Sequence, residues 1–87
     1  MPFVYILRCV DASLYVGVTT DVARRLRQHN AGVAAAYTAA RRPVAVVFTE
    51  EHPTLSAALS REHQLKRWTR KKKLALVAGD PALLKRL

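Results

Sequence analysis

Five side chains in this sequence are of types that can bind phosphate, move protons or hold a metal ion. Tyr5 and Tyr15 lie ten residues apart, on either side of a short polar stretch. Arg25 and His29 are four residues apart, and Glu62 is one of only six acidic residues. A guanidinium can hold a phosphate, an imidazole can move a proton, and a carboxylate can hold a metal ion. The elements that carry these side chains must therefore bring them to one place.

The position of Glu62 is unusual for an acidic side chain. At about 100° per residue, a helix over residues 54–68 places it in the middle of an apolar face. That face is formed by Leu55, Ala58, Leu59 and Leu65. A buried carboxylate without a partner is costly, so it requires a cation, a metal or a donor. A salt bridge to a nearby arginine, a solvated helix edge and a ligand for Mg²⁺ are the three interpretations.

Arg25 and His29 share one face of a short predicted helix, beside an apolar stripe of Val22 and Leu26 that we expect to face the core. A solvated basic surface is one interpretation of this pair. The other is a site in which the guanidinium binds a phosphate through two hydrogen bonds. The imidazole would then act as an acid, as a base or as a hydrogen-bond donor to the phosphate.

The charge of the chain points to a polyanionic partner. Fifteen Lys and Arg face six Asp and Glu, a formal net charge of +9 over 87 residues. Nucleic acid, most of all DNA, is the first choice, and a membrane surface is the second. The expected nucleic-acid contacts are one aromatic residue and eight cations: Tyr37, Arg24, Arg27, Arg41, Arg42, Lys66, Arg67, Arg70 and Lys71. Trp68, among the last of these cations, has two interpretations, base stacking and core packing.

The composition limits the class of protein. A hydrophobic fraction of 51% indicates a globular chain, and the length indicates one domain, residues 1–87. A single cysteine, Cys9, allows no intrachain disulfide. We see neither a signal peptide nor an apolar run long enough for a membrane span, so we expect a cytoplasmic protein.

The first third of the chain predicts a hairpin followed by a helix. Residues 3–9 and 14–18 are rich in strand-forming types, and Asp11 to Ser13 predict the turn between them. Gly17 within the second strand indicates a bulge or the close approach of another backbone. Residues 21–29 predict the helix, which ends near a left-handed Gly32.

The remaining segments complete an α+β architecture. Residues 33–42 predict a long loop with room for one helical turn, and residues 44–49 predict a third strand. Helices follow over residues 54–68 and 70–78, the second capped by Thr69 and Gly79, with a short helix from Pro81 onward. The expected fold is a small three-stranded antiparallel sheet flanked by helices, in the order ββαβαα.

These residues resemble the GIY-YIG nuclease family, in particular its small stand-alone bacterial branch. Residues 3–5 (FVY) stand where the family has its first tripeptide, with Phe3 in place of glycine, and residues 15–17 (YVG) stand for the second. Arg25, His29 and Glu62 match the family's arginine, its frequent histidine and its metal-binding glutamate. The resemblance covers roughly residues 3–75.

The resemblance implies hydrolysis of a phosphodiester with one metal ion. Glu62 would hold Mg²⁺ or Mn²⁺, and Tyr5 would activate the nucleophile, helped by a neighbouring basic group or by its own phenolate form. Tyr15 would bind phosphate or water, and Arg25 would stabilise the added charge. We expect both tyrosines to lie side by side on one face of the sheet and to point towards Glu62.

The expected function is a metal-dependent endonuclease that selects DNA by structure, in repair or recombination. The alternative is a nucleic-acid-binding module of the same fold with little or no catalysis. Residues 33–36 (VAAA) favour the alternative, because related small proteins carry lysines in this loop. Action on RNA is a third interpretation.

Overall fold

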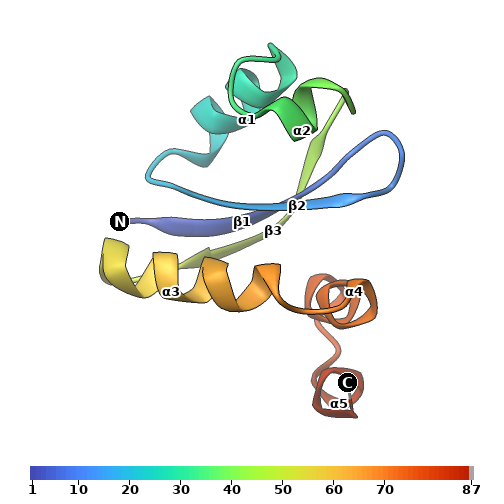
Figure 1. Ribbon diagram of the computed structural model, residues 1–87. Coiled ribbons are helices and arrows are strands. Elements are labelled where there is room, and N and C mark those ends of the chain that lie inside the picture. The colour runs from blue at the N-terminus through green and yellow to red at the C-terminus, as the bar shows by residue number, and fades with distance from the viewer. Residues whose placement is uncertain (87) are drawn as a thin grey trace.

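The computed structural model describes residues 1–86 and has a three-stranded antiparallel sheet with helices on both faces (Figure 1). β1 (Phe3–Arg8) is central, β2 (Leu14–Thr19) forms one edge and β3 (Ala45–Glu51) the other. The predicted α+β fold is confirmed. Leu87, the last residue of the predicted domain, lies outside the described part of the chain.

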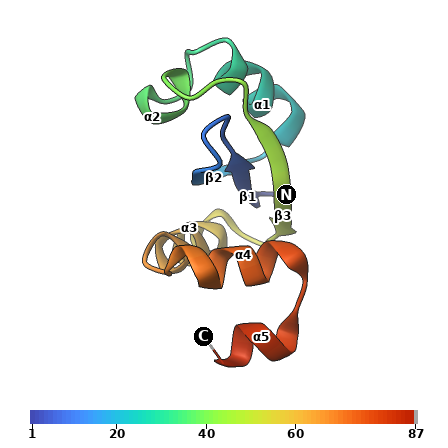
Figure 2. The ribbon, with the colours of Figure 1, turned by 90° about the vertical axis from the view of Figure 1, so that its right-hand side faces the viewer.

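Five helices surround the sheet. α1 (Val22–Asn30) and α2 (Ala36–Ala39) cover one face, and α3 (Leu55–Lys66) and α4 (Arg70–Ala78) lie on the other (Figure 2). α5 (Pro81–Arg86) contacts α4 on the side away from the sheet. Within residues 1–86, no helix is both long and apolar enough to cross a bilayer.

The hairpin of β1 and β2 sets the positions of the tyrosines. Asp11 holds the turn by accepting from the backbone N–H and the hydroxyl of Ser13, at 3.0 and 2.6 Å. In the resulting register Tyr5 lies opposite Gly17, and Tyr15 lies opposite Leu7. Successive side chains of a strand point to opposite faces, so both tyrosines share a face. They are diagonal neighbours, two positions apart, and not side by side as expected.

The alternation along β1 gives the sheet two cores. The α3-side core contains Val4, Ile6 and Val16 with Ala58 and Leu65 of α3. The α1-side core contains Tyr5, Leu7, Cys9 and Val44, with Leu26 of α1 and Tyr15 packed against it. Residue parity therefore decides which helical layer each side chain of β1 meets.

Local capping signals fix the helix ends. The side chains of Asp21, Thr54 and Thr69 accept from backbone N–H groups of the first turns of α1, α3 and α4, at 3.0, 3.1 and 3.2 Å. Gly79 ends α4 with φ at +69°. Trp68 lies between α3 and α4, where it packs against the α3-side core, and Lys72 Nζ lies 4.3 Å from the centre of its ring.

Two leucines predicted on the buried face of α3 are exposed. Leu55 is 56% exposed and Leu59 is 46% exposed, whereas Ala58 and Leu65 are fully buried. The face that packs on the sheet is centred on Ala58 and Leu65, so Leu59, about 100° further round the helix, turns to solvent. Leu55 begins the helix, in an exposed stretch over residues 53–56.

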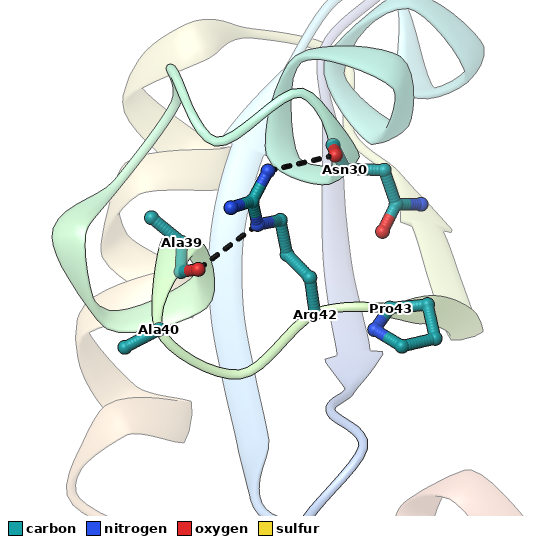
Figure 3. A pocket seen from close by; sticks show the side chains of 5 residues that line it. All are labelled: Asn30, Ala39, Ala40, Arg42 and Pro43. Carbon is teal, nitrogen blue, oxygen red and sulfur yellow. Dashed lines mark hydrogen bonds between the residues drawn. The ribbon is translucent and has the colours of Figure 1, made fainter.

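The segment between α1 and β3 is held at both ends. The Asn30 amide donates to the Val44 carbonyl at 3.0 Å and accepts from the Val44 N–H at 2.8 Å. Arg42 donates through Nε to the Ala39 carbonyl at 2.9 Å and through a terminal nitrogen to the Asn30 carbonyl at 3.4 Å (Figure 3). These bonds fix the single helical turn of α2, which was expected within the loop.

Candidate active site

A buried chain of hydrogen bonds joins the sheet to α1 and α2. The Tyr5 hydroxyl lies 2.8 Å from His29 Nε2, and His29 Nδ1 lies 2.7 Å from the Thr38 hydroxyl. The Thr38 hydroxyl donates to the carbonyl of Ala35 at 3.2 Å. Tyr5, His29 and Thr38 are each at most 3% exposed. The interpretation of His29 as part of a solvated surface is therefore wrong.

The hydrogen bonds of this cluster are all satisfied together in one arrangement. The single hydrogen of the Thr38 hydroxyl is donated to the Ala35 carbonyl, its oxygen accepts from His29 Nδ1–H, and Nε2 accepts from the Tyr5 hydroxyl. The opposite arrangement, in which Thr38 donates to Nδ1, leaves the Tyr5 hydrogen without an acceptor among residues 1–86. We therefore infer the Nδ1–H tautomer, in which His29 is a proton acceptor for the phenol.

Burial keeps both partners neutral. Burial above all, together with the charges of Tyr15 and Glu62, raises the pKa of Tyr5 to about 12, and the guanidinium of Arg25 acts in the opposite direction. Burial also lowers the pKa of His29 below its ordinary value of 6.5, and Arg25 acts in the same direction. At neutral pH the phenol is therefore protonated and the imidazole is free to accept its proton.

Gly17 makes room for the Tyr5 ring. A Cβ at this position would lie 2.5 Å from Tyr5 Cζ and 2.9 Å from Cε1, and closer still to the hydroxyl. The close approach predicted at Gly17 is thus made by a side chain, not by another backbone. The irregularity in the sheet lies elsewhere, between Ile6 and Leu7 on the ladder with β3.

Tyr15 borders the same cluster. Its ring meets His29 edge-on, with centroids 5.2 Å apart and planes at 64°. On its other side the ring of Tyr37 stacks at 6.1 Å and 27°. Arg41 lies over Tyr37 with Cζ 3.8 Å from the ring centre, and Asp11 holds Arg41 at 3.2 Å. Tyr15 is half-buried, whereas Tyr5 is 3% exposed.

Glu62 lies on α3, on the opposite side of the sheet from the tyrosine–histidine cluster. Tyr5 and Tyr15 lie on the face of the sheet that α1 covers, whereas α3 packs on the other face. α3 contacts the edge strand β2, and the charge of Glu62 still raises the pKa of Tyr5. The charge of Glu62 therefore influences the phenol of Tyr5 although α3 packs on the other face of the sheet.

The carboxylate of Glu62 fits the chemistry of a Mg²⁺ or Mn²⁺ ligand. Its side chain is 20% exposed, and its one ion pair is with Lys66, at 3.4 Å, whose side chain is 51% exposed. Glu50, by contrast, is engaged by Arg61 at 3.0 Å and by His52 at 2.7 Å. Within residues 1–86 no three His, Cys, Asp or Glu side chains gather, so a metal here would complete its shell with water and substrate oxygens.

The predicted nucleic-acid contacts fall into two groups. Arg41 and Arg42 are bound to Asp11 and to backbone carbonyls, so they stabilise the α2 segment. Two cations lie exposed on α1 and four lie exposed around the α3–α4 junction: Arg24, Arg27, Lys66, Arg67, Arg70 and Lys71. These six are exposed to a polyanion, and Lys66 alone among them pairs with an acidic side chain of residues 1–86, Glu62.

Sequence reasoning missed Thr38, which orients His29. The signal for it was weak but present, since Thr38 is the single hydroxyl besides Tyr37 in the alanine-rich stretch of residues 33–42. Asn30, which anchors the start of β3, was also missed.

The three-stranded sheet between helical layers is the fold expected of a GIY-YIG domain, a nuclease-type domain, and the chain belongs to the GIY-YIG family. Residues 1–75 match the family model described as the GIY-YIG catalytic domain.

Within that family the chain is similar to small proteins designated UPF0213. It is 58% identical to one from Haloquadratum walsbyi over 74 residues, covering 85% of this chain and 83% of that protein. It is 51% identical to one from Staphylococcus aureus over 75 residues, covering 86% and 92%. The solution NMR structure of a UPF0213 protein from Bacillus halodurans superposes with a TM-score of 0.59 at 41% identity, over 98% of this chain and 94% of the other.

Proposed function

We propose that this protein is a metal-dependent endonuclease that hydrolyses phosphodiester bonds in DNA and selects its substrate by structure, in repair or recombination. The observation that carries the proposal is the buried pair of Tyr5 and His29, in which a neutral phenol donates to a neutral imidazole. A bond of this kind between buried groups supplies a base without requiring a phenolate.

The proton follows the hydrogen bond. As a water oxygen bonds to phosphorus, Tyr5 accepts the water's proton and passes its own to His29 Nε2. The bond from phosphorus to the leaving oxygen breaks, and that oxygen takes a proton from solvent. Once the product has left, His29 Nε2 returns its proton to the Tyr5 oxygen, and Tyr5 gives its own proton to water, which restores both neutral groups. Thr38 holds the imidazole in the required tautomer throughout.

Arg25 and Tyr15 act on the phosphate. The guanidinium of Arg25 is close enough to influence the pKa of both Tyr5 and His29, so it can stabilise negative charge that develops beside them. The half-buried hydroxyl of Tyr15 can donate to a phosphate oxygen or to the attacking water. Neither group needs to change its protonation state.

Glu62 would hold the metal ion. A bound Mg²⁺ or Mn²⁺ supplies Lewis-acid stabilisation of charge on the phosphate and the leaving oxygen. The protein's part is to present one carboxylate at the sheet's edge and to release Lys66 from it.

Nicking of supercoiled plasmid in Mg²⁺ tests this proposal. Glu62→Gln is expected to lower the cleavage rate at least a hundredfold, while Glu51→Gln, which removes the same charge from an exposed position at the end of β3, leaves it unchanged. Salt-sensitive DNA binding should survive in both variants. Cleavage at the full rate in Glu62→Gln would contradict the proposal.

A nucleic-acid-binding module with little catalysis is the second candidate. The loop over residues 33–36 has no cation, while six predicted contacts are exposed elsewhere. Tight binding without nicking of supercoiled, branched or single-stranded DNA in Mg²⁺ or Mn²⁺ would favour it. Competition by RNA tests whether RNA is the ligand instead.

A further inference from the structure

The ring of Tyr37 is enclosed by two neighbours, although the residue is 39% exposed. The ring of Tyr15 stacks on it at 6.1 Å and 27°, and the guanidinium of Arg41 lies over it with Cζ 3.8 Å from the ring centre. Because Tyr15 and Arg41 cover its faces, this ring is not available for stacking on a ligand. Its contacts serve the protein itself, and they lead to the tyrosine–histidine cluster.

Arg41 is held by three contacts. Asp11 pairs with its Nε at 3.2 Å, and a terminal nitrogen donates to the Tyr37 carbonyl at 2.9 Å. The carbonyl of Arg41 accepts from the N–H of Val10 at 3.0 Å. The arginine thus ties α2 to the turn between β1 and β2. A planar guanidinium that is fixed in this way also restrains the aromatic ring on which it stacks.

Two consecutive residues of α2 contact two neighbouring members of the site. Thr38 is fully buried, and its hydroxyl lies 2.7 Å from His29 Nδ1. Tyr37 stacks on Tyr15, and the ring of Tyr15 in turn meets His29 edge-on, with centroids 5.2 Å apart. α2 therefore holds His29 through one side chain and Tyr15 through the one before it.

We propose that Tyr37 is a positioning residue, which holds the ring of Tyr15 against His29 and so fixes the place of the Tyr15 hydroxyl. A strand fixes the backbone of a residue but not its χ1 rotamer, so the half-buried Tyr15 requires such a support. A displacement of about 1 Å can lower a catalytic rate about a hundredfold. The role of the Tyr15 hydroxyl towards phosphate or water rests on the proposed function, whereas the packing of the rings does not.

NMR of the protein without metal or DNA tests the positioning itself. The cross-peak between the ring protons of Tyr15 and His29 is compared with the one between Tyr5 and His29, whose centroids are 5.8 Å apart. In Tyr37→Ala the first cross-peak is expected to weaken while the second persists. Tyr37→Leu keeps apolar bulk without a flat face and should give an intermediate loss, and Tyr37→Phe should match the parent. Val47→Ala removes packing from the α3-side core and, as the control for a general loss of stability, should change neither cross-peak.

Plasmid nicking in Mg²⁺ tests the consequence for catalysis. Tyr15→Phe removes a donor to the transition state and is expected to lower kcat about a hundredfold. Tyr37→Ala only displaces that donor, so we expect kcat to fall about tenfold with KM unchanged, and Tyr37→Phe to retain the parent rate. In a Tyr15→Phe background, Tyr37→Ala is expected to cost nothing further, because it acts through the missing hydroxyl. A merely structural role would lower the rate equally in both backgrounds.

Two results would overturn the proposal: a Tyr15–His29 cross-peak as strong in Tyr37→Ala as in the parent, or an equal loss of rate on Tyr37→Ala in both backgrounds. A parent protein without detectable nicking would refute the proposed nuclease, and the NMR comparison would still decide the positioning. Intact nicking with an unchanged cross-peak in Tyr37→Ala would refute the positioning role alone.

Discussion

Replacing Gly17 by alanine is expected to destabilise the protein by about 2–5 kcal/mol. In a strand with ordinary backbone angles this change would normally stabilise by about 0.4–1 kcal/mol, because it reduces the freedom of the unfolded chain. Here the new methyl group would lie 2.5 Å from Tyr5 Cζ and 2.9 Å from Cε1. The buried ring must then move, which costs about 1–3 kcal/mol for overpacking and about 1–3 kcal/mol for the broken bond to His29.

Urea denaturation gives the free energy of unfolding, and a double-mutant cycle identifies the cause. In a Tyr5→Leu background the three clashing atoms are absent, so Gly17→Ala is expected to be neutral or to stabilise by up to about 1 kcal/mol. The sign of the effect therefore reverses with the residue at position 5. Gly79→Ala is a control with a different mechanism, since nothing lies within 4 Å of its added methyl group but its φ is +69°. That change should cost about 1–2 kcal/mol in either background.

The reasoning would be refuted by a Gly17→Ala variant as stable as the parent, or by an equal loss of stability in the Tyr5→Leu background. NMR of the histidine ring provides a second readout. Displacement of Tyr5 removes the donor to Nε2, so the Nε2 resonance of His29 is expected to shift in Gly17→Ala and to stay unchanged in Gly79→Ala.

Three further predictions concern the same site. Thr38→Val leaves Nδ1–H of His29 buried without an acceptor, so we expect the free energy of unfolding measured in urea to fall by about 1–3 kcal/mol and plasmid nicking to slow. Thr38→Ser should restore both. Unchanged nicking in the valine variant would contradict the role given to the tautomer. The nicking rate should fall as the pH drops below 6.5, with a midpoint under that value because burial and Arg25 lower the pKa of His29. The free energy of unfolding should also fall from pH 6.5 downward, since the unfolded chain takes up the proton first. A midpoint of the nicking rate above pH 6.5 would be inconsistent with this reasoning. Lys66→Met removes the cation paired with Glu62, so Mg²⁺ binding by calorimetry should tighten up to about fivefold, and weaker binding would argue against Glu62 as the ligand.

The parts of the fold that depend on nearby residues could be predicted from the sequence. The hairpin turn at Asp11 and the caps at Thr69 and Gly79 involve residues at most a few positions apart, and the structure has them. The strand and helix order follows from such signals. The single helical turn within residues 33–42 could also be predicted, because alanine favours helix and the segment lies between Gly32 and Pro43, which interrupt helices.

The contacts within the site could not be predicted in the same way. The burial of His29 and its bond to Tyr5 depend on where α1 crosses the sheet, which joins residues 24 positions apart. The exposure of Leu59 depends on which side of α3 meets the sheet, and periodicity alone fixes this only to within about one residue's rotation. Glu62 was found through its anomalous position, but its place on the opposite side of the sheet from Tyr5 required the register of the hairpin.

The sharing of β1 between two cores constrains how the length of this chain can evolve. Val4 and Ile6 enter one core, and Tyr5 and Leu7 enter the other. Gain or loss of one residue before Tyr5 within the strand would exchange the two sets, placing the phenol in the α3-side core and an aliphatic side chain beside His29. Natural insertions and deletions should therefore be absent from β1. They should be frequent around Val33, which is 75% exposed and belongs to neither core.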